Sequence, residues 1–479
     1  MNVGSRITLG PGSATPALSI EDVFERQRTR AIALRVSTAD ERIATLRRLE
    51  KAILGRRAAI YAALAADLHK PEAEADLSEI MPILSEIRHT CRHLKSWMAP
   101  RRVPATLAML GTKAAIRHEP KGVSLIISPW NYPFNLTFGP LASAIGAGCT
   151  AIIKPSELTP HSAALMAEIV RDTFAPDDVA LFEGDASVAT ALLDLPFDHI
   201  FFTGSPAVGK VVMAAAAKHL ASVTLELGGK SPVIVDETAD LKKSARSIVW
   251  GKFANNGQTC IAPDYAYVHE SRMPQFIDAA RGAIAAMYGD AAASPDYCRI
   301  VNARHFARVR NLIDDATTRG ATIHAGGTAD AGQNFVAPTL LSNVSADSLI
   351  MQEEIFGPVL PILPYGDLAM PVREINARPK PLALYVYTKD KAIADRVITE
   401  TSAGGSCVNA SMAHFLHANL PFGGVNNSGI GNAHGFYGFR AFSHERAVLS
   451  DKFSATPMLF PPYSGRVKQM IKMTVKFFT

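Results

Sequence analysis

Cysteine is scarce in this sequence. Five cysteines are spread over 479 residues, an odd number with wide spacing, and none of them forms a CxxC pair. Zinc-ribbon sites and dithiol redox motifs require such closely spaced pairs, so both are excluded and no metal site is predicted. Free thiols in a reducing compartment are the simplest interpretation, and a cytoplasmic location is therefore expected.

The sequence also lacks a strong charge of either sign and a convincing membrane span. The formal net charge is +5 without a basic block, which argues against a nucleic-acid partner. The first residues, MNVGSRITLGPGSATP, contain no apolar segment of the kind found in secretory signals. Residues 122–153 carry no charge, but their prolines and asparagines would break a spanning helix. We expect a buried strand, a turn and a helix there instead.

What the sequence does contain is an alternation of short apolar runs with helical patterns. Residues 20–100 have apolar side chains at helical spacing. Apolar runs at 123–127, 150–153 and 199–202 are then separated by helical stretches, and a second series of this kind begins at Pro232. Short buried strands that alternate with helices predict an α/β fold, in which a parallel sheet is covered by helices on both faces.

The last residues, VKQMIKMTVKFFT, have the pattern of a basic amphipathic helix of about three turns. This helix either docks on its own fold or on a partner subunit, or it contacts a membrane surface. Its basic and apolar stripes consist of Lys468, Lys472 and Lys476, and of Val467, Ile471 and Val475.

A glycine-rich turn follows the apolar run HIFF. Gly204, Ser205 and Gly209 belong to GSPAVGK, which has the spacing of a P-loop. A true P-loop is disfavoured, because Val211 stands where a magnesium-binding hydroxyl is required. The turn is either purely structural or binds a dinucleotide pyrophosphate through N–H groups at a helix N-terminus. No GxGxxG fingerprint lies at a strand–helix junction, so the standard Rossmann signature is absent.

Lys154 and Glu157 come directly after the apolar run 150–153. Such a pair in a loop is usually a solvated ion pair. Ligands of open parallel sheets bind beyond the carboxyl ends of the strands, so the pair is also placed to hold the two hydroxyls of a ribose. A carboxylate in that position would repel a 2′-phosphate and therefore favour NAD over NADP.

Three side chains have the chemistry of a cysteine-dependent reaction. Cys260 lies in NNGQTCIAPDY among small and polar residues, whereas Cys149 lies in an apolar run and is interpreted as structural. Glu226 interrupts an apolar strand before two glycines, and it is either a general base or the partner of Lys230. Asn131 in PWNYP is either an amide donor to an oxyanion or an ordinary turn residue. No histidine near Cys260 in the sequence suggests itself as its base.

Taken in order, these motifs resemble the aldehyde dehydrogenase family. The match runs from about residue 20 to about residue 450 through PWNYP, KPSE, FTGSPAVGK, ELGGKSP, NNGQTC, EEIFGP, SCVNA and PFGGVNNSGIG. The resemblance implies that Cys260 is the nucleophile, Glu226 the general base and Asn131 the oxyanion donor. It also implies NAD, or alternatively NADP, as the cofactor, bound in a variant Rossmann domain. The residues that it implies in cofactor binding are Trp130, Lys154, Glu157, Gly204, Ser205, Gly209, Glu354 and Phe356.

The same resemblance implies how the chain is organised. An NAD(P)-binding domain would comprise residues 1–110 and 127–227 with 420–445, and a catalytic domain residues 228–419. Residues 111–126 with 446–479 would form an oligomerisation arm, and a homodimer is expected.

The segment CIAPDY is similar to the class-3 and fatty-aldehyde branch of the family. The expected substrate is therefore an aromatic aldehyde, such as coniferyl aldehyde, or an aliphatic one. A CoA-acylating dehydrogenase and a catalytically silent binding protein on the same scaffold are the alternatives.

Overall fold

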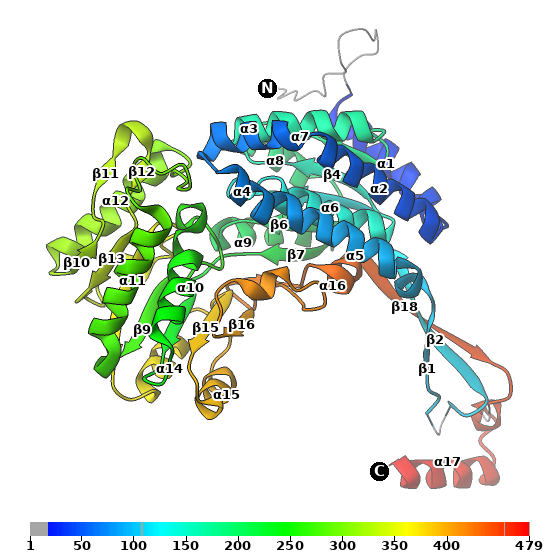
Figure 1. Cartoon of the computed structure of the whole chain (residues 1–479). Helices are drawn as coiled ribbons and strands as arrows, with labels where there is room; N and C mark the ends of the chain where they lie inside the picture. The colour runs from blue at the N-terminus through cyan, green and yellow to red at the C-terminus, as the bar shows by residue number, and fades with distance from the viewer. Residues whose placement is uncertain (1–17, 107–108, 455, 479) are drawn as a thin grey trace.

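A computed structural model describes residues 18–106, 109–454 and 456–478 of the chain. Its elements form two α/β units and a projecting arm (Figure 1). The first two helices begin at capping boxes, in which Ser19 pairs with Asp22 and Thr38 with Glu41. The N-terminal helices are α1 (Ile20–Leu34), α2 (Ala39–Gly55), α3 (Arg57–Leu68), α4 (Glu72–Ala75) and α5 (Met81–Met98), with a π-helical turn, Asp76–Ile80, before α5.

The first unit is built on a six-stranded sheet in the order β17-β7-β6-β3-β4-β5. Its strands are β3 (Val123–Ile127), β4 (Thr150–Lys154), β5 (Val179–Leu181), β6 (His199–Thr203), β7 (Ser222–Glu226) and β17 (Gly429–Ile430). All neighbours are parallel except β17, which pairs antiparallel with β7. The connecting helices are α6 (Asn135–Ala147), α7 (Pro160–Thr173), α8 (Ala186–Leu193) and α9 (Pro206–Ala217).

Helices cover both faces of this sheet. Helices α2, α3, α5, α6 and α7 pack on one face, and α1, α8 and α9 pack on the other. Burial on both sides explains why β3, β4 and β6 are continuous apolar runs rather than alternating ones. The predicted α/β fold class is confirmed.

The second unit has a seven-stranded sheet in the order β10-β13-β14-β9-β8-β15-β16, parallel except for β10. Its strands are β8 (Pro232–Val235), β9 (Tyr265–His269), β10 (Thr322–Ala325), β13 (Thr339–Ser342), β14 (Val359–Tyr365), β15 (Ala383–Tyr387) and β16 (Gly405–Val408). Helices α10 (Leu241–Phe253) and α11 (Met273–Tyr288) cover one face. The other face carries α12 (Ala303–Thr318), α13 (Leu349–Gln352), α14 (Ala369–Asn376) and α15 (Lys391–Glu400). A small hairpin joins β11 (Ala329–Asp330) to β12 (Phe335–Val336).

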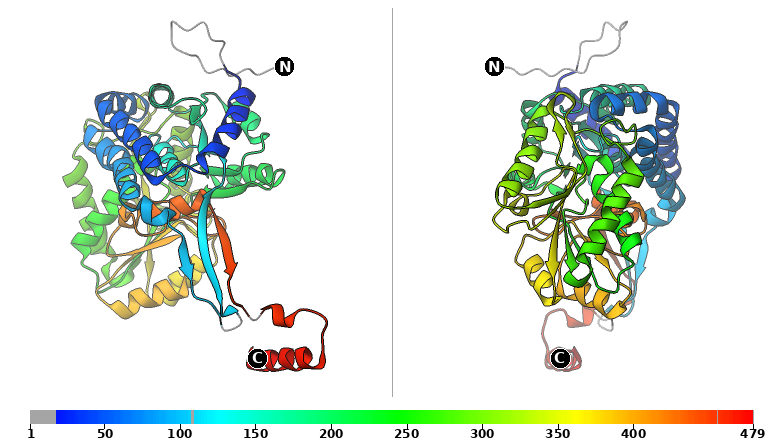
Figure 2. Two further views of the ribbon diagram at one scale, coloured as in Figure 1. Left: turned by 90° about the vertical axis from the view of Figure 1, so that its right-hand side faces the viewer. Right: turned by 60° about the vertical axis from the view of Figure 1, so that its left-hand side comes forward.

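A three-stranded antiparallel sheet forms the arm. It consists of β1 (Arg101–Val103), β2 (Thr112–Pro120) and β18 (Ser443–Asp451), and β2 and β18 pair along nine residues. The arm projects from the body, and the C-terminal helix α17 (Gly465–Phe478) lies at its far end (Figures 1 and 2). Helix α16 (Gly435–Ala441) returns the chain from the body to β18. Among the described residues, no helix is both long and apolar enough to cross a membrane.

The sequence-based domain division stays a prediction. The chain passes from the first large sheet to the second between β7 and β8, at residues 226 and 232, and returns to the first sheet at β17. The expected boundary after residue 126 falls inside β3, all five residues of which pair with β4.

Candidate active site

The carboxyl ends of the central strands of the first sheet meet at one edge. Ile127 of β3 is in register with Lys154 of β4, and Thr203 of β6 is in register with Glu226 of β7. Parallel strands bring their following turns together, so the segments after β3, β4, β6 and β7 are neighbours. These segments contain most of the residues that the sequence singled out.

Cys260 follows a strained turn at the end of α10. Asn255, Asn256 and Gly257 all have positive φ, at 50°, 56° and 72°. A Cβ at Gly257 would collide with the carbonyl of Gly357, so only glycine fits between the two segments. Left-handed residues in succession cost free energy and are found where a side chain must be aimed. The half-buried side chain of Cys260 is presented from this turn.

Asn131 is bound to the same turn. Its side-chain Nδ2 donates to the carbonyl of Gln258 at 2.9 Å, and its own carbonyl accepts from Nδ2 of Asn255 at 2.8 Å. Next to Asn131, the hydroxyl of Tyr132 lies 2.6 Å from Oγ1 of Thr259. The structure therefore brings Asn131 beside the Cys260 loop, although the two residues are 129 positions apart in the sequence.

Glu226 ends β7 and is buried. Neither of its carboxylate oxygens has a hydrogen-bond partner among the described residues. Lys230, the alternative partner, instead contacts Asp264 and donates to the carbonyls of Ile350 and Glu353, each at 2.8 Å. The hypothesis of a Glu226–Lys230 ion pair is thus wrong. Burial raises the pKa of Glu226 well above its usual value, which makes the ionised carboxylate a stronger proton acceptor than an exposed one.

Burial also raises the pKa of the Cys260 thiol, to about 12, and the carboxylates of Glu354 and Glu226 raise it further in that order of size. The pKa of Glu354 itself is raised to about 8 by burial and then by the charge of Asp264. In this state the sulfur is a thiol rather than a thiolate, and it needs a proton acceptor before it can attack a carbonyl.

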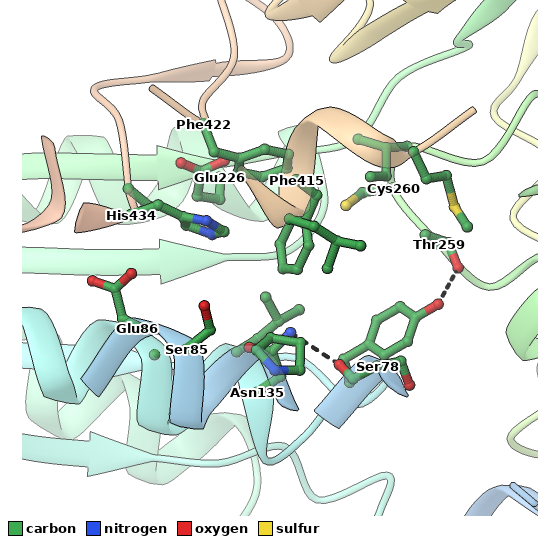
Figure 3. A pocket seen from close by; sticks show the side chains of 18 of the residues that line it. Ser78, Ser85, Glu86, Asn135, Glu226, Thr259, Cys260, Phe415, Phe422 and His434 are labelled. Atoms are coloured by element: carbon green, nitrogen blue, oxygen red, sulfur yellow. Dashed lines mark hydrogen bonds between the residues drawn. The ribbon is translucent and has the colours of Figure 1, made fainter. Parts of the chain in front are cut away.

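A largely apolar cavity of about 370 Å³ opens beside Cys260 and Glu226. Figure 3 shows both side chains across the cavity from Ser85 of α5 and Asn135 of α6. Four large apolar residues of the lining are solvent-exposed and mark its mouth: Leu77, Met81, Trp250 and Leu416. Phe415 and Phe422 form part of the inner wall. The cavity can therefore take an apolar molecule up to the sulfur.

The residues expected to bind a cofactor fall into two groups. At the edge of the first sheet, Nζ of Lys154 lies 2.9 Å from Oε2 of Glu157, and Ser205 caps α9 by accepting from the N–H of Val208. Gly204 and Gly209 flank this helix N-terminus, which is suited to bind an anion.

The second group lies where the two units meet. The ring of Phe356, a residue with φ of 45°, contacts the ring of Trp130 edge-on at 5.4 Å between centroids. The carboxylate of Glu354 lies directly against Gly228, because a Cβ at Gly228 would collide with it. Among the described residues, no three His, Cys, Asp or Glu side chains are grouped so that they could hold a metal ion.

Comparison with known proteins places this geometry in a family. The profile of the "Aldehyde dehydrogenase family" matches residues 12–448. The chain is 40% identical over 454 residues to a Pseudomonas aeruginosa protein named "Probable coniferyl aldehyde dehydrogenase", covering 94% of this chain and 95% of that one. The chain belongs to the aldehyde dehydrogenase family.

Solved structures agree with this assignment. The structure titled "Substrate bound state of Staphylococcus Aureus AldH" has a TM-score of 0.92 and 43% identity, and it covers 96% of this chain and 100% of that chain. An NAD⁺ complex of an aldehyde dehydrogenase from Bacillus cereus has a TM-score of 0.81 and 28% identity, covering 90% and 89%. The predicted enzyme class is confirmed: the chain is an NAD(P)-dependent aldehyde dehydrogenase.

The aldehyde dehydrogenase cavity also contains a histidine that the sequence did not indicate. His434 lines the cavity, and its ring lies 4.7 Å from that of Phe415 and 5.2 Å from that of Phe422. Burial lowers its pKa to about 4, so the imidazole is neutral near pH 7. His434 has φ of 72°, and Glu86 holds the next residue by accepting the N–H of Gly435 on both oxygens at 3.0 Å. No spacing rule connects position 434 to position 260, which explains why it was missed.

Proposed function

We propose that the enzyme oxidises its aldehyde through a covalent intermediate on Cys260. The sulfur adds to the carbonyl carbon and forms a thiohemiacetal, and its proton passes to Glu226. The observation that carries the proposal is that Cys260 and Glu226 line one apolar cavity, with both carboxylate oxygens of Glu226 unpaired. A carboxyl with a raised pKa is suited to accept a proton from a thiol and later from water.

The side-chain amide of Asn131, together with a backbone N–H at Cys260, stabilises the oxyanion of the thiohemiacetal. When bound, the oxidised nicotinamide supplies the hydride acceptor. A thioester on Cys260 results. Glu226 then releases this first proton to solvent and takes a second proton from the water that attacks the thioester carbon. The C–S bond breaks, the acid leaves, and the second proton passes from Glu226 to the sulfur, which restores the thiol.

Several residues would hold the cofactor. Lys154 and Glu157 bind the adenosine ribose, and the turn from Gly204 through Ser205 to Gly209 binds the pyrophosphate at the N-terminus of α9. Glu354 binds the nicotinamide ribose, and Phe356 packs near the nicotinamide with Trp130 beside it. This assignment is supported by the shared sheet edge, where the turns after β4, β6 and β7 lie together. The carboxylate of Glu157 favours NAD over NADP.

Replacing Cys260 by Ser tests the chemistry. A hydroxyl is a far weaker nucleophile at this position, so we expect NADH formation to fall at least about 1,000-fold. Glu226→Gln should instead permit at most one equivalent of NADH per site and then stall, because the thioester is not hydrolysed. Stopped-flow absorbance and mass spectrometry of the trapped acyl-enzyme measure both results. Near-normal turnover of Cys260→Ser would refute the assignment.

The substrate is an apolar aldehyde, either aromatic and coniferyl-like or aliphatic of medium to long chain. The support is the apolar lining of the cavity and the exposed apolar residues at its mouth. A relative named for coniferyl aldehyde adds support for the aromatic alternative. A panel of benzaldehydes, cinnamaldehydes and alkanals ranked by kcat/KM decides between them. A preference for small charged aldehydes would contradict the proposal.

The enzyme is a homodimer whose arm, residues 111–126 with 446–479, forms the contact. The support is that β2 and β18 extend from the body (Figure 2), and that the apolar side chains of Leu449 on β18 and of Phe453 just after it are exposed. Light scattering on the eluted protein measures the mass, and a monomer at micromolar concentration would contradict this. A cytoplasmic location is supported by five free cysteines.

Helix α17 contacts a membrane surface at its periphery. It contains Arg466 and three lysines and no acidic residue. Its Val467, Met470 and Ile471 are half-buried, while the lysines are exposed. The helix contacts the short turn Thr456–Leu459. A basic helix with an apolar stripe binds anionic lipid surfaces.

A further inference from the structure

The segment from Lys70 to Ile80 carries charged side chains into the interior beside the active site. Both side chains of the Lys70–Glu79 pair are fully buried, and Nζ of Lys70 lies 2.6 Å from Oε1 of Glu79. The desolvation of two charges is costly, so a buried ion pair is weak evidence for stability alone. The turn that carries Glu79 is π-helical, a rare geometry that is frequent at functional sites.

The pair holds both ends of the turn that presents Asn131. Besides Glu79, Nζ of Lys70 donates to the carbonyl of Asn131 at 3.2 Å and lies 4.3 Å from the centre of the Tyr132 ring. The second oxygen of Glu79 accepts the N–H of Asn135 at 3.0 Å, at the start of α6. One buried pair therefore fixes the backbone on either side of the Asn131 turn.

The nucleophile loop is tied to the same segment. The carbonyl of Asn131 also accepts from Nδ2 of Asn255, and the N–H of Asn255 donates to Oε1 of Glu74 at 2.7 Å. Glu79, which accepts from Asn135, and Glu74, which accepts from Asn255, are only five positions apart in the sequence. The relative position of the Asn131 amide and the Cys260 sulfur thus depends on this segment.

We propose that Lys70 and Glu79 are positioning residues, which set the orientation of the Asn131 amide toward the oxyanion formed at Cys260. The inference rests on the proposed role of Asn131 as an oxyanion donor. Neither Lys70 nor Glu79 lines the cavity, so their effect on the reaction passes through the backbone of Asn131.

A double-mutant cycle tests the proposal on the full-length enzyme. Lys70→Met keeps the length of the side chain, and Glu79, buried and without its cation, can remain as a neutral acceptor for Asn135. We expect the single-turnover rate of NADH formation to fall about 10- to 100-fold, as misplacement of a catalytic group by about 1 Å does. The KM for aldehyde and the Kd for NAD should stay within about threefold.

The decisive measurement is the same substitution in an Asn131→Ala background. If Lys70 acts through Asn131, Lys70→Met then costs less than about twofold, because coupled residues are not additive. An equal loss in both backgrounds, or a wild-type rate in Lys70→Met, overturns the proposal. An unchanged rate in Asn131→Ala alone would instead refute the oxyanion role, a separate failure.

Two further variants guard against a general loss of structure. Should Lys70→Met not fold, the cycle uses Lys70→Met with Glu79→Gln, in which the amide oxygen accepts from Asn135 without a facing cation. Arg42→Met is the matched control: Arg42 is also buried and donates to the carbonyls of Gly146 and Ala147, at the other end of α6. We expect it to lower Tm and leave the single-turnover rate within about twofold.

Discussion

At the scale of single residues, the protonation of Cys260 sets the reactivity of the free enzyme. Its pKa is raised to about 12, so at pH 7 the thiolate fraction is very small. We expect alkylation of Cys260 by iodoacetamide to accelerate about tenfold per pH unit between about pH 7 and pH 10, because only the thiolate reacts. Mass spectrometry of the Cys260 peptide measures the rate.

The neighbouring carboxylates give this prediction a control. After burial, Glu354 contributes most to the raised pKa of the thiol, and its own pKa is about 8. Above about pH 8 its charge opposes ionisation of the sulfur, so Glu354→Gln should speed alkylation at about pH 9 severalfold and change little at about pH 7. Cys407, which is also half-buried, serves as the internal reference. Equal acceleration at both pH values would mean that Glu354 acts through packing rather than charge.

The choice between the two cofactors depends on the Lys154–Glu157 pair. Because the Glu157 carboxylate is half-exposed at the sheet edge, it can face a 2′-phosphate directly. We expect Glu157→Gln to raise kcat/KM for NADP relative to NAD by about tenfold, the effect of removing one repulsive charge at close range. Glu168→Gln, an exposed carboxylate on α7, is the control. If NADP is already preferred by the wild type, the assigned role of Glu157 is wrong.

At the scale of elements, the sharp turn after α10 is the part of the site that tolerates change least. Gly257 has φ of 72°, and a Cβ at this position would collide with the carbonyl of Gly357. Gly257→Ala should therefore lower the free energy of unfolding by about 2–4 kcal/mol and reduce NADH formation. Gly282→Ala, inside α11 with open space around it, should be neutral or stabilising by about 0.5–1 kcal/mol. Urea unfolding compares the two, and equal effects would contradict the argument.

Local elements and motifs could be predicted from the sequence, whereas contacts between distant segments could not. Strands such as β3 and β4 are short apolar runs, and the functional residues of motifs such as NNGQTC are consecutive in the sequence. Both kinds of feature could therefore be predicted. The Asn131–Gln258 contact joins residues 127 apart, and the Asn255–Glu74 contact joins residues 181 apart. Such contacts, like the place of His434 in the cavity, are set by tertiary packing that no local pattern records. The Glu226–Lys230 alternative failed for the same reason, since Lys230 found closer partners on another segment.

At the scale of the whole molecule, the arm carries its C-terminal helix away from the catalytic body (Figure 2). Helix α17 contacts the short turn Thr456–Leu459. Its exposed lysines and the exposed apolar residues nearby, Phe460 and Tyr463, are thus presented together at one end of the protein. A substrate dissolved in a membrane would then be taken up by an enzyme held at that surface.

This arrangement predicts salt-dependent binding to anionic vesicles. We expect the enzyme to float with vesicles that contain phosphatidylglycerol but not with pure phosphatidylcholine, and to be released as the salt concentration rises. Each basic residue near an anionic surface contributes about 1 kcal/mol, so Lys468→Glu with Lys472→Glu should weaken binding by about 30-fold or more. The matched control, Lys242→Glu with Lys243→Glu on α10, makes the same charge change on the catalytic body and should bind as the wild type does. Turnover of a short water-soluble aldehyde should be unchanged in both variants. If the control pair weakens vesicle binding equally, the binding depends only on the net charge of the protein and not on α17. If the enzyme binds neither kind of vesicle, α17 docks on protein instead.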